Sequence, residues 1–71
     1  MKKLSYKPLF KILVDKNMTN KVLMKEANIS KSSFYKLKNS ENVTTDILLR
    51  ICNVLDCDIS DIVECEEDVD K

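Results

Sequence analysis

The sequence predicts an all-α fold, in which five short helices pack into one compact domain. Three observations support this fold class. The 71 residues include no glycine and one proline, the two residue types that most destabilise a helix interior. Capping residues recur along the chain, and the apolar residues between them follow the spacing of an amphipathic helix. No run of β-branched residues alternates with polar residues, so no strand is expected.

Four of the helix starts are predicted by one local pattern that recurs along the chain. An apolar residue precedes a Ser, Thr or Asp, and a second apolar residue follows four positions later. The side-chain oxygen can accept an otherwise unpaired backbone N–H, while the two apolar residues pack as a hydrophobic staple. The capping residues are Thr19, Ser30, Thr44 and Asp58. With Pro8 acceptable in a first turn, the expected helices span 7–16, 20–27, 31–38, 45–55 and 59–64.

The helix ends follow from residues that tolerate the left-handed conformation. Helices often end on glycine in that conformation, and otherwise on asparagine. Because the chain has no glycine, the expected stops are Asn17, Asn28, Asn39 and Asp56.

Helical spacing also predicts the core and the extent of the domain. The residues expected to face inward are Tyr6, Leu9, Phe10, Leu13, Val14, Leu23, Ala27, Phe34, Leu37, Leu48, Ile51, Cys52, Leu55, Ile59 and Ile62. Residues 65–71 are acidic and nearly without apolar side chains. We therefore expect a domain spanning 1–64, followed by a frayed acidic tail at 65–71.

Length and composition exclude several classes of function. A chain this short buries only about 60% of the surface that its unfolded form exposes, which leaves a thin core and little room for a catalytic cavity. It has no histidine, no glycine-rich phosphate loop and no paired acids on a common face. We expect no enzyme, no catalytic residue, no cofactor and no small-molecule substrate. No apolar run approaches the roughly 18 residues of a membrane span, so a cytoplasmic protein without membrane contact is expected.

The three cysteines do not indicate a metal or redox site. The spacing of Cys52, Cys57 and Cys65 matches no zinc or redox motif, and an odd count argues against a closed disulfide framework. Structural zinc normally takes four Cys or His ligands, which this chain lacks. We expect no metal and three reduced thiols, two in the core and Cys65 in the tail.

The net charge of zero conceals a strong division between the two halves of the chain. Residues 1–39 carry ten lysines and two acids, a balance of +8, whereas residues 40–71 carry two cations and ten acids, a balance of −8. Such a division indicates a basic face for a polyanion. The alternative is two solvated surfaces without a partner.

The expected helices at 20–27 and 31–38 are short and separated by a tight turn at 27–30, which is the helix-turn-helix plan. In the second of them, Phe34 and Leu37 point to the core. The opposite stripe holds donors and hydroxyls and no carboxylate: Lys31, Ser32, Tyr35, Lys36 and Asn39. Such side chains can reach base edges and phosphates of double-stranded DNA. The alternative is an ordinary solvated helix face.

Nearly the whole chain resembles one family. Residues 19–37, TNKVLMKEANISKSSFYKL, resemble the helix-turn-helix of the lambda-repressor/Cro family, and the segments ENVTTD and LDCDISDIVE look like its fourth and fifth helices. The opening YKPLF, together with CDI and DI near the end, is similar to a compact subgroup from Gram-positive bacteria and mobile elements. The resemblance covers about residues 6–64. It implies a five-helix lambda-repressor-like DNA-binding domain. It also implies a transcriptional regulator, more often a repressor than an activator, that acts as a homodimer.

The resemblance also implies the role of individual residues. It places base reading at Lys31, Ser32, Tyr35 and Lys36. It places contacts to the DNA backbone at Thr19, Asn20, Lys21, Ser33, Asn39 and Ser40. Two departures stand out: Asn28 replaces the usual glycine of the turn and can adopt the left-handed conformation, and Met24 replaces a common alanine where the two helices approach.

A protein–protein module of the antitoxin or anti-repressor type is the alternative function. Its partner surface would be the acidic half, including Asp46, Asp56, Asp58, Asp61 and Glu64. Salt-sensitive binding of duplex DNA by the isolated protein distinguishes the two classes. For a homodimer, the sequence offers Ile12, Ile62 and Val63 as spare apolar candidates.

Overall fold

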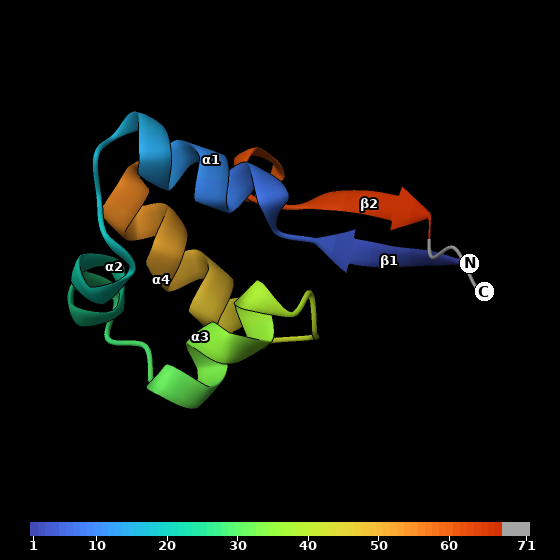
Figure 1. Cartoon of the computed structure of the whole chain (residues 1–71), viewed down its shortest axis with the longest axis horizontal. Helices are drawn as coiled ribbons and strands as arrows, with labels where there is room; N and C mark the ends of the chain where they lie inside the picture. Colours follow the sequence, from blue (N-terminus) through green and yellow to red (C-terminus); the bar gives the residue numbers. More distant parts are fainter. Residues whose placement is uncertain (68–71) are drawn as a thin grey trace.

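The structure is a computed structural model that describes residues 1–67 of the 71-residue chain. A small helical body carries a projecting pair of antiparallel strands, with the N-terminus at the tip of the pair (Figure 1). The elements in chain order are β1 (Lys2–Ser5), α1 (Lys7–Asp15), α2 (Asn20–Ala27), α3 (Lys31–Lys38), α4 (Thr45–Leu55), the short 3-10 helix η1 (Ile59–Asp61) and β2 (Glu64–Glu67).

The four predicted helix starts are confirmed by the hydrogen bonds of their capping residues. The hydroxyl of Thr19 accepts the N–H of Val22 at 3.2 Å, and Thr44 caps α4 in the same way. The hydroxyl of Ser30 accepts the N–H of Ser33 at 3.2 Å. At η1 the bonds are reciprocal, because Asp58 caps the turn while its own N–H donates to the carboxylate of Asp61 at 2.9 Å. The capping pattern therefore determines where each helix begins.

Three of the four predicted helix stops are confirmed, and one is displaced. Asn17, Asn28 and Asp56 adopt positive φ angles of 60°, 55° and 53°. Asn39 was expected to do the same but has a φ of −94°, and Ser40 takes the left-handed conformation at 58°. Helix α3 nevertheless ends at Lys38 as predicted, and the left-handed Ser40 lets the N–H of Glu41 bond the carbonyl of Lys36 at 2.8 Å.

The expectation of five α-helices and no strand is wrong. The structure has four α-helices; the expected fifth helix at 59–64 is the single 3-10 turn η1, which ends at Asp61. The capping box fixes only this one turn. Beyond it the fully buried Ile62 anchors the chain, which then extends as β2. Strand β2 pairs antiparallel with β1 from Lys2↔Glu67 to Ser5↔Glu64.

The expected frayed tail is correspondingly wrong over residues 65–67, which are paired in β2. Residues 68–71 of that expected tail lie outside the described part of the chain. Opposite charges explain how such a polar strand pairs. Across the strands the ammonium of Lys2 lies 3.9 Å from the carboxylate of Glu67, and from the start of α1 that of Lys7 lies 3.1 Å from Glu66. Cross-strand pairs of opposite charge stabilise antiparallel strands.

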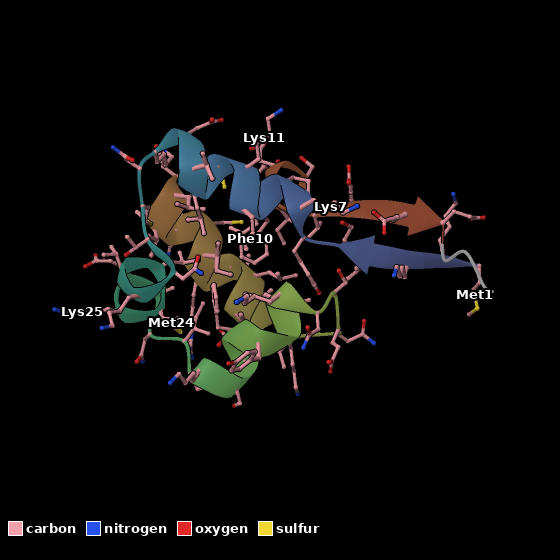
Figure 2. The ribbon with its side chains drawn as sticks, viewed as in Figure 1. Met1, Lys7, Phe10, Lys11, Met24 and Lys25 are labelled. Atoms are coloured by element: carbon pink, nitrogen blue, oxygen red, sulfur yellow. The ribbon has the colours of Figure 1, made fainter. Side chains whose placement is uncertain are left out.

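The core lies between α4 and the other helices, and the predicted inward residues form most of it. The buried apolar residues are Tyr6, Leu9, Leu13, Leu23, Ala27, Ile29, Phe34, Leu37, Leu48, Ile51, Cys52, Leu55 and Ile62. Phe10 and Ile59 are partly buried against this cluster. Phe10 meets Phe34 edge to face, with ring centroids 5.9 Å apart. In Figure 2 the Phe10 side chain lies among the helices of the body.

Two apolar residues of α1 exchange their expected positions. Val14 was expected in the core but is 76% exposed, because the buried face of α1 centres on Leu9 and Leu13. Ile12 instead packs against the core cluster, as does Val63. Of the three apolar residues suggested for a dimer contact, Ile62 is fully buried, whereas Ile12 and Val63 are partly exposed.

Candidate nucleic-acid interface

The turn between α2 and α3 is held rigidly by its own backbone and by α4. Asn28 has φ 55° and ψ 52°, so it occupies the left-handed conformation that glycine would otherwise supply. The N–H of the buried Ile29 donates to the carbonyl of Met24 at 2.9 Å. Arg50 of α4 donates to the carbonyl of Asn28 at 3.0 Å and pairs with Asp46 at 2.8 Å. The two helices therefore keep a fixed relation to the body.

The two sides of α3 divide as the spacing predicted. Phe34 and Leu37 are 4% and 1% exposed, whereas the whole expected outer stripe is exposed: Lys31, Ser32, Tyr35, Lys36 and Asn39. No residue of α3 is acidic. The helix thus presents ammonium groups, hydroxyls and one aromatic ring from a backbone anchored by two core side chains.

The serines at the start of α3 form a small network of hydroxyls. Ser30 donates to the hydroxyl of Ser33 at 3.1 Å, and its oxygen lies 3.2 Å from that of Ser32. Either hydroxyl can donate in the second contact, so the exposed Ser32 can donate to a ligand or accept from one. Ser33 is half-buried and turned toward the cap.

Five of the ten expected contact residues line hollows on two sides of α3. On the side toward α2, a hollow of about 150 Å³ is lined by Asn20, Met24, Lys31, Phe34, Tyr35 and Lys38. On the side toward α4, a hollow of about 330 Å³ is lined by Ser33, Lys36, Asn42, Val43, Thr44 and Ile47. Thr19 and Lys21 lie exposed at the start of α2, and Ser40 is half-buried at the reversal after α3.

Sequence reasoning missed Lys38 and the polar residues at the start of α4. Lys38 lies seven residues after Lys31, so the helical repeat that placed Lys31 and Tyr35 on one stripe also includes it. Its ammonium lies 5.8 Å from the centre of the Tyr35 ring, within range of a cation–π attraction. Asn42 and Thr44 lie next to α3 only in the folded chain, and local sequence spacing does not predict this proximity.

The basic surface is narrower than the count of lysines implied. Lys2 and Lys7 form ion pairs with carboxylates of β2, as described above. The hydrogen bond and charge of Lys7, with a contribution from Lys3, lower the pKa of Glu66. Among residues 1–67, no ion pair includes a lysine of α2 or α3. Lys11 and Lys16, in and just after α1, likewise form no ion pair within residues 1–67, so five of these seven lysines lie on α2 and α3: Lys21, Lys25, Lys31, Lys36 and Lys38.

The cysteines lie away from this surface and carry free thiols. Cys52 is buried, Cys57 is half-buried, and Cys65 is exposed on β2 rather than in a tail. Burial raises the pKa of Cys57 to about 11 and also raises that of Cys52, and the two side chains share a hydrogen bond. Within residues 1–67, no three Cys, Asp or Glu residues gather in a way that could hold a metal ion.

Comparison with known proteins identifies the family. A family model described as the Cro/C1-type helix-turn-helix DNA-binding domain matches residues 9–68. The chain belongs to this family. The crystal structure of transcriptional regulator VanUg is similar to it, with a TM-score of 0.91 and 40% sequence identity over 94% of this chain and 89% of that one. No curated protein matches the sequence.

In this Cro/C1-type domain the matched region extends from α1 through β2. The membership establishes a helix-turn-helix DNA-binding fold, made here of four helices and a small strand pair. None of the helices in residues 1–67 is long and apolar enough to cross a membrane.

Proposed function

We propose that this protein is a transcriptional repressor that binds double-stranded DNA sequence-specifically in the cytoplasm, with α3 in the major groove. The outer stripe of α3 carries this proposal, because it presents donors and no carboxylate from a helix fixed to the core by Phe34 and Leu37. The similar VanUg is itself described as a transcriptional regulator. Occupying a site at a promoter requires only DNA contacts, which is why repression is the simplest mode for such a domain.

The proposed contacts fall into two groups. Lys31, Ser32, Tyr35 and Lys36 read base edges, because they are exposed along the stripe that faces away from the core. The exposed hydroxyl of Ser32 can donate to or accept from a base edge, because its contact with Ser30 fixes neither role. The backbone contacts lie at the starts of α2 and α3 and at the end of α3: Thr19, Asn20, Lys21, Ser33, Asn39 and Ser40.

We also propose that two copies act together on DNA. One short helix in one major groove contacts few base pairs, whereas a dimer reads two half-sites about 34 Å apart. Among residues 1–67, Val14 and Leu49 are large apolar side chains that remain mostly exposed on the helical body. A selected site without two-fold symmetry, bound by a complex of monomeric mass, would contradict the dimer.

The alternative of an acidic partner surface draws less support from the structure. Several acids of the second half are engaged within the fold. Asp58 and Asp61 form the capping box, Asp46 pairs with Arg50, and Glu66 pairs with Lys7. These carboxylates stabilise local structure and are less available to a partner.

Selection of bound sequences from random duplexes tests the proposal directly. We expect a recurring site, and an affinity for it well above that for random duplex at the same salt concentration. Asn20→Ala, at the start of α2, should weaken binding to all sequences about equally. Failure to bind any duplex at low salt would refute DNA binding and return attention to a protein partner.

A further inference from the structure

The hollow between α2 and α3 has an apolar floor and a cationic rim. Its floor is formed by Met24 of α2 and by Phe34 of α3, which is itself a core residue in edge-to-face contact with Phe10. Figure 2 places Met24 between the two helices. Two exposed lysines, Lys31 and Lys38, also line the hollow, and we take these as its rim. A surface of this kind exposes carbon to water in the middle of a region suited to a polyanion.

Tyr35 forms one wall of this hollow. It is 56% exposed, so its ring is free to contact a ligand, and the nearby Lys38 ammonium restricts where the ring can lie. Lys31, Tyr35 and Lys38 follow one another at spacings of four and three, and therefore share one side of α3. Asn20, at the start of α2, closes the opposite edge. The hollow thus opens on the side of the domain that the proposed function turns toward DNA.

Size and chemistry limit what can occupy the hollow. At about 150 Å³ it is smaller than the roughly 300–1,000 Å³ pockets that hold small-molecule ligands. A phosphate on the floor would lose its hydration against carbon without a compensating donor there. A small apolar group carried by a polyanion fits both parts, with carbon on the floor and phosphates near the rim. In the major groove of DNA, that group is the 5-methyl of a pyrimidine.

We propose that the hollow formed by Met24, Phe34 and Tyr35 reads the 5-methyl group of a thymine in the binding site. This inference rests on the proposed function and adds to it a base preference. It assigns to the ring of Tyr35 a role in specificity. The resemblance to the family implied only that Tyr35 occupies a base-reading position. The hydroxyl of Tyr35 is not needed for this role.

The test replaces each thymine of the selected site, one at a time, by uracil, which removes the methyl and leaves the hydrogen-bonding edge unchanged. We expect one position per half-site at which the affinity of the wild-type protein falls about fourfold, the effect of exposing one buried methyl. Tyr35→Ala should abolish this thymine preference. Tyr35→Phe, the matched control, should retain it because the ring remains. Circular dichroism confirms that both variants are folded, as expected for an exposed side chain.

Thymine and methylated cytosine carry the same methyl group, so a second set of duplexes distinguishes them. Cytosine and 5-methylcytosine are compared at the sensitive position. A larger gain from methylating cytosine than from replacing uracil by thymine would overturn the assignment to thymine.

The remaining outcomes separate this inference from the proposed function. If the protein binds the selected site but no uracil substitution changes its affinity, the hollow does not read a methyl group, while the proposed function stands. If Tyr35→Ala retains the full preference for thymine, the methyl is read elsewhere and the assignment to this hollow fails. Absence of binding to any duplex refutes the proposed function itself.

Discussion

The salt dependence of DNA affinity should reflect phosphate contacts made by the lysines of α2 and α3, and not by the lysines at the strand pair. Each phosphate neutralised by a lysine contributes about −0.9 to the slope of log affinity against log salt concentration, through release of bound counterions. If all ten lysines of residues 1–39 met phosphates, the slope would approach about −9 per protomer. If only the five lysines of α2 and α3 met phosphates, the slope would be about −4.5 per protomer.

The measurement is the affinity for the selected duplex at several salt concentrations, with the mass of the complex determined so that the slope can be expressed per protomer. Lys21→Ala should reduce the magnitude of the slope by about 1, because Lys21 is the lysine proposed to contact the DNA backbone. Lys7→Ala is the matched control: Lys7 already pairs with Glu66, so the slope should not change. A slope near −9, or a clear effect of Lys7→Ala, would refute the division of the lysines; a flat dependence would refute phosphate binding altogether.

Three further predictions concern single groups. Lys36→Ala should weaken binding to the selected site by about 1–3 kcal/mol and relax selectivity at one or two base pairs. Single-base variants of that site measure the selectivity. If every sequence is weakened equally, Lys36 contacts phosphate only. A thiol reagent at pH 8 should modify the exposed Cys65 quickly and Cys57 only slowly, because a pKa of about 11 leaves little thiolate at that pH; equal rates would contradict the burial of Cys57. The pKa of Glu66 is lowered, so its ion pair stabilises the fold fully at pH values above the usual pKa of 4.5. This stabilisation is lost as the pH falls below that value. Thermal unfolding of Glu66→Gln should therefore show a weaker decline in stability over this acid range than the wild type.

Local sequence signals predicted the helices because each start depends on a few adjacent residues. Thr19 caps α2 through a hydrogen bond to Val22, only three positions away, and Ser30 caps α3 in the same manner. The outer stripe of α3 was likewise predictable, since it follows from the helical repeat and the two core side chains Phe34 and Leu37.

Features that depend on residues far apart in the chain were not predictable in this way. The pairing of β1 with β2 brings together residues such as Lys2 and Glu67, which no local periodicity reveals. The shape of the hollow between α2 and α3 depends on the angle between the two helices. The sequence spacing of Met24 and Lys38 therefore did not predict that they line the same hollow. The left-handed residue after α3 is Ser40 and not Asn39, a shift of one position that residue preferences do not decide.

The strand pair also has a consequence for the order in which the domain forms. Its partners, from Lys2↔Glu67 to Ser5↔Glu64, are separated by nearly the whole described chain. Forming them first would close one long loop with little to compensate the lost entropy. The helices must therefore assemble before β1 and β2 meet, and amide hydrogen exchange should find the strands opening at a lower free energy than α4. Tyr6 and Ile62, both buried next to the strands, mark the boundary at which that opening ends.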